Sequence, residues 1–281
     1  MRVVDVSEII PIVARLCVEA NIYLDRDVIE SIEEFASVEE SPLAREILEQ
    51  ILENARLAAV EKMPMCQDTG VTVVFVELGQ EVCIVGGDFE DAINEGVRIG
   101  YRDGFLRKSM VDDPIFNRKN TGDNTPAVIH TELVPGSDVK ITVAPKGAGS
   151  ENMSEVRMLR PADGLEGLME FVVDRVSRSG GMPCPPVIVG VGVGGDLEQC
   201  AYLSKKALLR PLNVINPDPR WRSVEDELLK RINRLGIGPM GLGGRTTALA
   251  VQISAMPCHI ASLPVAVNLQ CHAQRHKTAV I

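Results

Sequence analysis

The spacing of apolar residues changes near residue 63, and this change constrains the fold more than any other feature. Before it, apolar side chains recur three or four positions apart, which is the spacing of one buried helix face. They are Leu43, Ile47, Ile51, Ala55 and Ala58. After it, residues 71–78 form a continuous run rich in β-branched side chains, which is typical of a buried strand. The chain is therefore expected to pass from helices into a sheet-containing body.

Local signals place the expected elements. Ser41-Pro42 has the form of an N-cap followed by proline at the first helical position, and Met63-Pro64 is expected to end that helix. Further helices are expected over residues 88–107, 163–178 and 221–235, with another beginning at Asp196. Strands are expected over 71–78, over 82–85 as its partner, over 127–134 and 139–143 joined by a Pro135-Gly136 turn, over 186–195 and over 260–269.

This pattern predicts a mixed α/β (α+β) fold. Residues 1–62 form a helical N-terminal segment, and residues 63–281 form an α/β body that carries the functional residues. The two parts are also compatible with one continuous domain, 1–281.

Composition excludes several classes of function. The 281 residues are 45% hydrophobic, which suffices for one large core or two smaller ones. The formal net charge of −10 argues against nucleic acid as a partner. The apolar runs 71–76 and 187–193 are far shorter than the roughly 20 residues of a membrane-spanning helix, and a signal-peptide pattern is absent. We therefore expect a cytoplasmic protein with no membrane partner.

The cysteine count narrows the chemistry. There are seven cysteines, an odd number, and no two form a C-x-x-C pair, which disfavours both a disulfide framework and a zinc ribbon. Buried thiols, a catalytic thiol or widely spaced ligands of a cluster remain. The seven are Cys17, Cys66, Cys83, Cys184, Cys200, Cys258 and Cys271.

Three segments combine cysteine with turn-forming or polar residues. Residues 65–70 place Cys66 beside Gln67, Asp68, a threonine and a glycine, between a helix and a strand. Residues 180–186 surround Cys184 with glycines and prolines, which suits a metal ligand but equally a rigid loop with a buried thiol. Residues 258–276 hold Cys258, Cys271 and three of the four histidines, which are metal ligands or acid–base groups unless they belong to a solvated tail.

Two glycine runs match the string G-x-G-x-x-G of dinucleotide-binding proteins, at residues 190–195 and 236–241. The fingerprint also requires an acidic residue about 20 positions later, and neither run has one. Close approach of two backbone segments, or a helix N-terminus that faces an anion, explains the glycines equally well. A nicotinamide-dependent dehydrogenase is therefore only a distant alternative.

Taken together, these segments resemble the α subunit of class I, iron–sulfur-dependent fumarate hydratases and the related L-tartrate dehydratases. The resemblance covers most of the chain after about residue 60 and depends on several strings in order. They are Cys66-Gln67-Asp68-Thr69-Gly70, Leu106-Arg107-Lys108-Ser109, residues 120–126 (NTGDNTP), residues 144–152 (APKGAGSEN), Cys184-Pro185-Pro186, Gly238-Pro239-Met240-Gly241 and Cys271-His272.

The resemblance implies a cofactor and a set of site residues. Cys66, Cys184 and Cys271 would hold a [4Fe–4S] cluster with one iron not ligated by protein, and that iron would act as a Lewis acid in the reversible hydration of fumarate to L-malate. The residues implied at the substrate are Gln67, Asp68, Arg107, Gly149 and His259. Among these, Asp68 and His259 would transfer the proton on the oxygen side, and Arg107 would bind a carboxylate.

The resemblance also implies a partner. Single-chain members of this family continue into a second domain with further cationic contacts, and no such region is recognisable here. We therefore expect a separate β subunit and a hetero-oligomer. The alternatives that remain open are an L-tartrate dehydratase α subunit and, in another class, a non-catalytic metal-binding subunit.

Overall fold

The computed structural model describes residues 1–281, and the chain divides into two compact units. Unit 1 comprises Met1–Leu24, Ala55–Ala148 and Arg275–Ile281. Unit 2 comprises Asp25–Asn54 and Gly149–Gln274. Each unit has its own hydrophobic core. Helix α3 (Pro42–Glu61) contributes residues to both.

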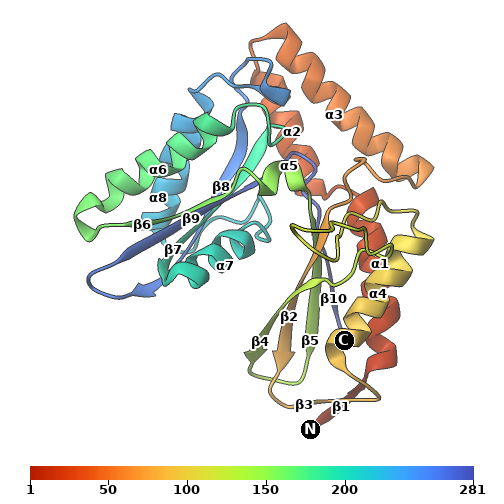
Figure 1. Cartoon of the computed structure of the whole chain (residues 1–281). Coiled ribbons are helices and arrows are strands. Elements are labelled where there is room, and N and C mark those ends of the chain that lie inside the picture. Colours follow the sequence, from red (N-terminus) through yellow and green to blue (C-terminus); the bar gives the residue numbers. More distant parts are fainter. The chain divides into compact units, whose positions relative to one another are not determined.

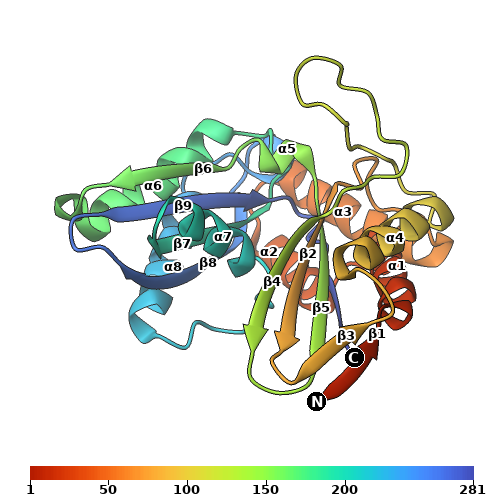
Figure 2. The same cartoon turned by 60° about the horizontal axis from the view of Figure 1, so that its bottom comes forward.

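Unit 1 is built on a four-stranded mixed sheet. The helices and strands of unit 1 are β1 (Arg2–Asp5), α1 (Val6–Ile22), β2 (Val71–Gly79), β3 (Val82–Val85), α4 (Phe89–Asp103), β4 (Val128–Val134), β5 (Val139–Lys146) and β10 (Lys277–Val280). The strand order is β10-β5-β2-β4, with β2 parallel to β4 and antiparallel to β5 (Figure 1). Helices α1 and α4 pack side by side, and α1 contacts β5 and β10 (Figure 2). The core of unit 1 lies between this helix pair and the sheet.

Unit 2 contains a second four-stranded mixed sheet. Its elements are α2 (Arg26–Val38), α5 (Ala148–Glu151), β6 (Glu155–Leu159), η1 (Pro161–Asp163), α6 (Gly164–Ser179), β7 (Val187–Gly195), α7 (Leu197–Ala207), α8 (Pro219–Asn233), η2 (Pro239–Gly241), β8 (Ala248–Cys258) and β9 (Leu263–Gln270). The strand order is β6-β9-β7-β8, with β7 parallel to β8 and antiparallel to β9. Helix α7 covers one face, and α6 and α8 pack on the other.

Strand β7 explains the first glycine run. Side chains alternate across a strand, so Val189 enters the core with α6 and α8 while Gly190 and Gly192 face α7. A Cβ on Gly190 would lie 2.1 Å from the Ser204 carbonyl oxygen, and one on Gly192 would lie 2.0 Å from that of Cys200. These glycines therefore permit close packing of helix on strand. They lie inside β7, where a phosphate-binding turn does not occur, which argues against the dinucleotide interpretation.

The predicted fold class and most of the predicted elements are confirmed. The first sixty residues are helical apart from β1, and a mixed α/β body follows. Capping signals located the helix starts well: Ser41 Oγ accepts from the Ala44 amide at 3.3 Å, and Asp196 caps α7 by accepting from the Gln199 amide. Helix α4 ends at Asp103, four residues earlier than expected, because Gly104 takes the C-cap position.

One predicted strand pairing is wrong. Strand β3 pairs with β1, not with β2. The Pro135-Gly136 turn does join β4 and β5, as predicted, and both strands pair with β2, which lies between them. The buried β2 takes the central position because its backbone N–H and C=O groups then have hydrogen-bond partners on both sides.

Other differences concern packing and missed strands. Leu43 is 51% exposed, and the buried stripe of α3 runs instead through Ala44, Ile47, Leu48 and Ile51. The expected strand over 260–269 begins only at Leu263, after a turn. Strands β1, β6, β8 and β10 were not predicted. Strand β8 escaped notice because polar residues, including the buried Gln252, interrupt its apolar run.

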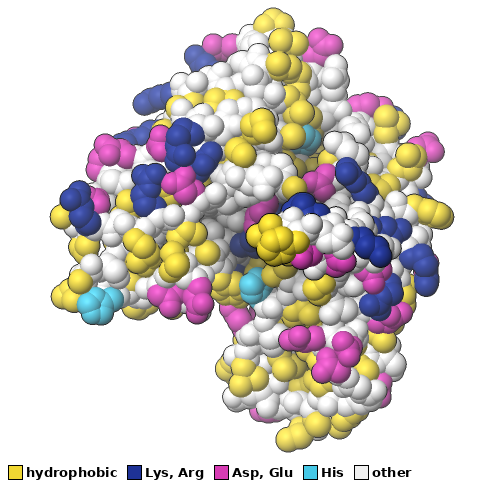
Figure 3. Space-filling model, viewed as in Figure 1, with side chains coloured by type: hydrophobic (Ala, Val, Ile, Leu, Met, Phe, Trp, Pro, Cys, Tyr) yellow, Lys and Arg dark blue, Asp and Glu magenta, His cyan; other side chains and the backbone are white.

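The surface carries charges of both signs. On the face shown in Figure 3, Lys and Arg side chains lie interspersed with Asp and Glu. A site for a dianionic ligand must therefore gather its cations locally, because the overall field of this acidic chain opposes binding. None of the helices combines the length and the apolar character that crossing a bilayer requires.

Candidate active site

The segment from Cys66 to Gly70 forms a tight connection between α3 and β2 in unit 1. Gly70 has a φ of +79°, and a Cβ there would lie 2.7 Å from the backbone nitrogen of Lys146, so only glycine fits. Cys66 is half-buried, Gln67 is exposed, and the Cys66 Sγ lies 3.8 Å from the Gln67 Oε1. The turn thus buries its last residues and leaves the thiol and the amide accessible. We call residues 66–70 the Cys66 turn.

Two side chains from elsewhere in unit 1 bind the backbone of the Cys66 turn. The Tyr101 hydroxyl, on α4, donates to the carbonyl oxygens of Thr69 at 2.8 Å and Gly70 at 3.1 Å. Asn124 Nδ2 also donates to the Gly70 oxygen, at 3.2 Å. Burial raises the pKa of the Tyr101 hydroxyl, so it remains a neutral donor. These buried carbonyls therefore have partners that water cannot supply.

Asp68 ties the turn to two further segments. Its Oδ1 accepts from the Gly70 amide at 3.0 Å, and its Oδ2 accepts from the Ala148 amide at 2.8 Å. Its backbone carbonyl accepts from Arg275 Nη1 at 2.5 Å, and the same nitrogen lies 3.2 Å from Asn21 Oδ1. A carboxylate has acceptor positions left after two such bonds. Asp68 can therefore hold the turn and still face a proton donor.

Arg107 is held beside the Cys66 turn through its backbone. The Thr69 hydroxyl donates to the Arg107 carbonyl oxygen at 2.8 Å. The Arg107 side chain is exposed, and its guanidinium makes no hydrogen bond or ion pair within the chain. A free guanidinium has the planar fork of donors that binds a carboxylate with two hydrogen bonds.

Unit 2 brings Cys184 and Cys271 to the same end of its sheet. Cys184 precedes β7 and Cys271 follows β9, and these antiparallel strands place Ile188 opposite Gln270. The His272 amide donates to the Cys184 carbonyl oxygen at 3.4 Å, and His272 Nδ1 lies 3.0 Å from the same oxygen. Both cysteines are half-buried, and neither forms a disulfide. The antiparallel pairing of β7 with β9 is what unites two cysteines 87 positions apart.

Backbone contacts hold the segment that carries Cys184, residues 180–186, which we call the Cys184 segment. The Cys184 amide donates to the Gly181 carbonyl at 3.1 Å, and the Met240 amide donates to the Pro185 carbonyl at 2.8 Å. Cys184 has a φ of +56°, a left-handed conformation that is costly for a residue with a side chain. Such strain persists only where the surrounding structure imposes it, and it occurs often at functional sites.

Gly149 lies beside the Cys184 segment. It is exposed in α5, and a Cβ built on it would lie 3.4 Å from the Met182 carbonyl oxygen, an ordinary contact distance. Its φ is not in the left-handed region. The fold therefore does not itself require glycine here.

His259 lies at the other end of the unit 2 sheet. It occupies an exposed turn between β8 and β9, where its Nδ1 accepts from the Ala261 amide at 3.1 Å. The 8 residues of β9 separate this turn from Cys271, a length of roughly 25 Å. Cys258, which the sequence left open as a fourth ligand, accompanies His259. Unit 2 therefore does not place Cys258 or His259 near Cys184 and Cys271.

The predicted cluster ligands come from both units, Cys66 from unit 1 and the other two from unit 2. Within neither unit do three His, Cys, Asp or Glu side chains gather around a common point. All three cysteines are half-buried and outside any disulfide, and thiolates are the ligands that iron–sulfur clusters use. The chemistry of this donor set therefore fits the implied cluster.

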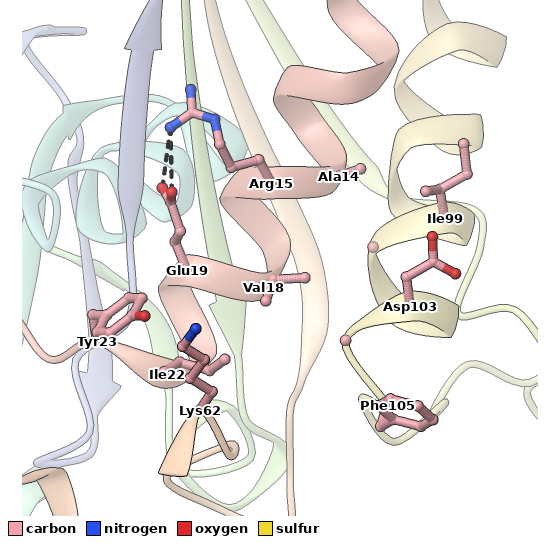
Figure 4. Close-up of a pocket in the computed structure, with 12 residues that line it drawn as sticks. Ala14, Arg15, Val18, Glu19, Ile22, Tyr23, Lys62, Ile99, Asp103 and Phe105 are labelled. Carbon is pink, nitrogen blue, oxygen red and sulfur yellow. Dashed lines mark hydrogen bonds and ion pairs between the residues drawn. The ribbon is translucent and has the colours of Figure 1, made fainter. Parts of the chain in front are cut away.

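A hollow of about 560 Å³ lies between α1 and α4 in unit 1 (Figure 4). Its charged lining consists of Arg15, Glu19, Lys62 and Asp103, and Arg15 pairs with Glu19 at 3.2 Å. Two carboxylates offset the two cations, and none of the predicted site residues lines it. It is therefore poorly suited to a dicarboxylate.

Sequence patterns did not single out Tyr101 and Arg275, which both bind the Cys66 turn. Tyr101 is one of only three tyrosines, and its hydroxyl sits within an otherwise apolar helix face, which is a detectable signal. Arg275 is 3% exposed, and a buried arginine so close to Cys271 is a signal only once its burial is known.

Comparisons with known proteins agree on one family. Residues 10–280 match the family described as fumarate hydratase (Fumerase). The putative L(+)-tartrate dehydratase subunit alpha of Methanocaldococcus jannaschii is 42% identical over 270 residues, which cover 94% of each chain. The L(+)-tartrate dehydratase subunit alpha of Escherichia coli K12 is 31% identical over 278 residues, which cover 98% of this chain and 91% of the relative.

Proposed function

Because this chain belongs to the fumarate hydratase family of hydro-lyases, we propose that it is the α subunit of an iron–sulfur enzyme that converts fumarate reversibly to L-malate. The observation that carries this proposal is the Cys66 turn. Side chains from several segments fix its backbone, while Cys66 and Gln67 remain accessible and Arg107 keeps a free guanidinium beside it. A thiolate ligand, a carboxylate and an unpaired cation are the groups that hydration of a dicarboxylate requires.

The cofactor is a [4Fe–4S] cluster held by Cys66, Cys184 and Cys271. When bound, such a cluster with one iron free of protein ligands supplies a Lewis acid for the substrate hydroxyl, which is otherwise a poor leaving group. Two observations support this assignment: none of the three cysteines forms a disulfide, and His272, which follows Cys271, contacts the Cys184 carbonyl oxygen.

The residues of unit 1 bind and orient the substrate. Arg107 binds one carboxylate through two parallel N–H donors, and the Gln67 amide supplies a further hydrogen bond. Asp68 transfers the proton on the oxygen side: it protonates the hydroxyl that leaves in dehydration and takes a proton from water in hydration. The base that removes the proton from the neighbouring carbon comes from the β subunit.

Gly149 provides space for the substrate. Gly149→Ala should leave the free energy of unfolding unchanged or slightly increased, because alanine favours a helix and meets no clash. The same variant should lower kcat/KM about tenfold, since a methyl group would intrude on the bound dicarboxylate. Equal kcat/KM values for variant and wild type would remove Gly149 from the site.

His259 can serve the reaction only at the site of a second copy of the chain, because roughly 25 Å of strand separates it from Cys271. A mixing experiment tests this role. Assemblies made from Asp68→Asn and His259→Asn chains together, each inactive alone, should regain activity at sites that receive one intact residue from each copy. If the mixture stays as inactive as its components, or if His259→Asn alone is fully active, His259 has no such role.

The partner is a separate β subunit. The relatives are named as alpha subunits, and a dianionic substrate needs cationic contacts besides Arg107, which a chain of net charge −10 does not favour. The α chain with its cluster rebuilt should show less than a hundredth of the fumarate hydratase activity of the same chain mixed with the β subunit. An isolated chain that hydrates fumarate at an ordinary enzymatic rate contradicts the need for a partner.

A second candidate reaction is dehydration of L-tartrate, which the names of the relatives favour. L-Tartrate differs from L-malate by one hydroxyl, and a site that hydrogen-bonds this group would prefer it strongly. Measuring kcat/KM for L-malate and L-tartrate on one preparation decides between them. A value for L-malate at least tenfold higher supports fumarate hydratase, and the reverse ratio supports tartrate dehydratase.

A further inference from the structure

Glu39 is a buried carboxylate that the proposed reaction does not use. It follows α2 and is 1% exposed. Its two oxygens accept hydrogen bonds from the amides of Glu40, Ser41, Arg245 and Thr246 at 2.9–3.2 Å. They also accept one from the Thr246 hydroxyl at 2.6 Å. No ammonium or guanidinium group bonds to this carboxylate, so N–H and O–H donors alone stabilise its charge.

The charged state of Glu39 matters for these contacts. Burial alone would raise the pKa of Glu39, but the hydrogen bonds from Thr246, Arg245 and Ser41 outweigh it and hold the pKa below its ordinary value. An ionised carboxylate accepts at both oxygens, whereas an amide would turn an NH₂ group toward one set of backbone donors.

Arg245 and Thr246 belong to residues 236–247, which form most of the connection between α8 and β8 and which we call the glycine loop. Nearer its start, the loop packs on the Cys184 segment, where the Met240 amide donates to the Pro185 carbonyl at 2.8 Å. The approach is so close that a Cβ on Gly241 would lie 2.6 Å from the Gly181 Cα. Close packing of two backbone segments beside Cys184 therefore accounts for the second glycine run.

We propose that Glu39 is a positioning residue for Cys184: its carboxylate fixes the glycine loop, and the glycine loop fixes the segment that presents the thiol. The functional importance of Glu39 rests on the proposed function, in which Cys184 is a cluster ligand. The positioning itself is a property of this chain alone. The competing interpretation is a local anchor that holds α2 and α3 together and has no effect at Cys184.

Residue-resolved alkylation separates these interpretations. The full chain, reduced and free of metal, is treated with iodoacetamide, and the alkylation rate of each cysteine is followed by mass spectrometry. Glu39→Gln should raise the rate at Cys184 at least fivefold and leave the exposed Cys258 unchanged. Glu40→Gln is the matched control, because the neighbouring Glu40 makes a surface ion pair with Arg245 at 2.9 Å and should alter neither rate.

A milder variant covers the case in which Glu39→Gln does not fold. Thr246→Val removes only the hydroxyl bond to Glu39 and should raise the Cys184 rate by a smaller factor, about twofold. An unchanged Cys184 rate in the folded variants overturns the proposal, as does an equal rise at every cysteine. Because this readout needs no cluster, it can fail while the iron–sulfur assignment stands, and the reverse also holds.

Discussion

Two of the three cysteine-bearing segments of the proposed site, the Cys66 turn and the Cys184 segment, are held by different kinds of contact. In unit 1, the side chains of Tyr101, Asn124 and Arg275 donate to backbone carbonyls of the Cys66 turn. In unit 2, the Cys184 segment is held mainly by backbone amides and by glycines that allow close approach, and His272 Nδ1 is the one side-chain group described against its backbone. The difference implies that the Cys66 turn is sensitive to substitution at several distant positions. The Cys184 segment should tolerate side-chain changes but depend on the path of the glycine loop.

The largest effect is expected from removing the acceptor that links the Cys66 turn to Ala148. In Asp68→Asn, one amide nitrogen must face a backbone N–H, and the side chain no longer transfers a proton. We expect kcat to fall at least about 100-fold, which is the scale of acid–base catalysis. Steady-state assays of the reconstituted α and β chains, at equal iron content, measure it. Asp138→Asn, at an exposed ion pair with Arg2, is the control and should stay within twofold of wild type.

The next prediction compares the Cys66 turn, which is held by side chains, with the Cys184 segment, which is held mainly by backbone contacts. Tyr101→Phe removes the hydroxyl that bonds the Thr69 and Gly70 carbonyls, of which only Gly70 keeps the Asn124 amide, and should lower the free energy of unfolding by about 2 kcal/mol. Met182→Ala, on the Cys184 segment, removes a side chain that is 67% exposed and should cost less than about 0.5 kcal/mol. Urea unfolding of both variants provides the measurement. Similar losses in the two would mean that the segments are held alike.

The smallest effect depends on pH. Burial would raise the pKa of Asp123, but hydrogen bonds from Thr125 and Arg98 lower it to about 2. The folded pKa lies below the unfolded value of about 3.9, so the stabilisation is fully present above about pH 5 and is lost as the pH falls toward 2. Asp123→Asn should cost about 1 kcal/mol at pH 7, after allowance for solvent screening, and the difference from wild type should shrink at pH 3. An equal difference at both pH values would contradict the assigned pKa.

Local signals predicted the fold as far as local chemistry decides it. The caps at Ser41 and Asp196 located helices, and β-branched runs located β2 and β7. Local signals did not predict the strand order, because tertiary packing decides which strands pair. Strand β3 pairs with β1, and β2 lies between β4 and β5. Strand β8 was missed because its buried polar residue breaks the apolar run.

The candidate site was predictable in its residue types but not in its arrangement. The strings around Cys66 and Cys184 identified polar groups on loops, which is where function concentrates. That Cys184 and Cys271 share one end of a sheet follows from the antiparallel register of β7 with β9. The same register places His259 at the opposite end. Nothing in the spacing of the residues revealed that Tyr101 and Arg275 bind the turn, because those contacts join distant segments.

Anaerobic reconstitution with iron and sulfide tests the central claim most directly. The full chain should bind a complete [4Fe–4S] cluster, measured by iron content, visible absorbance and electron paramagnetic resonance of the reduced form. Cys66→Ala, Cys184→Ala and Cys271→Ala should each lose most of that iron, whereas Cys258→Ala, at the far end of the unit 2 sheet, should bind as much as wild type. Full cluster content in all three of the first variants would contradict the assignment of these thiolates as the ligands.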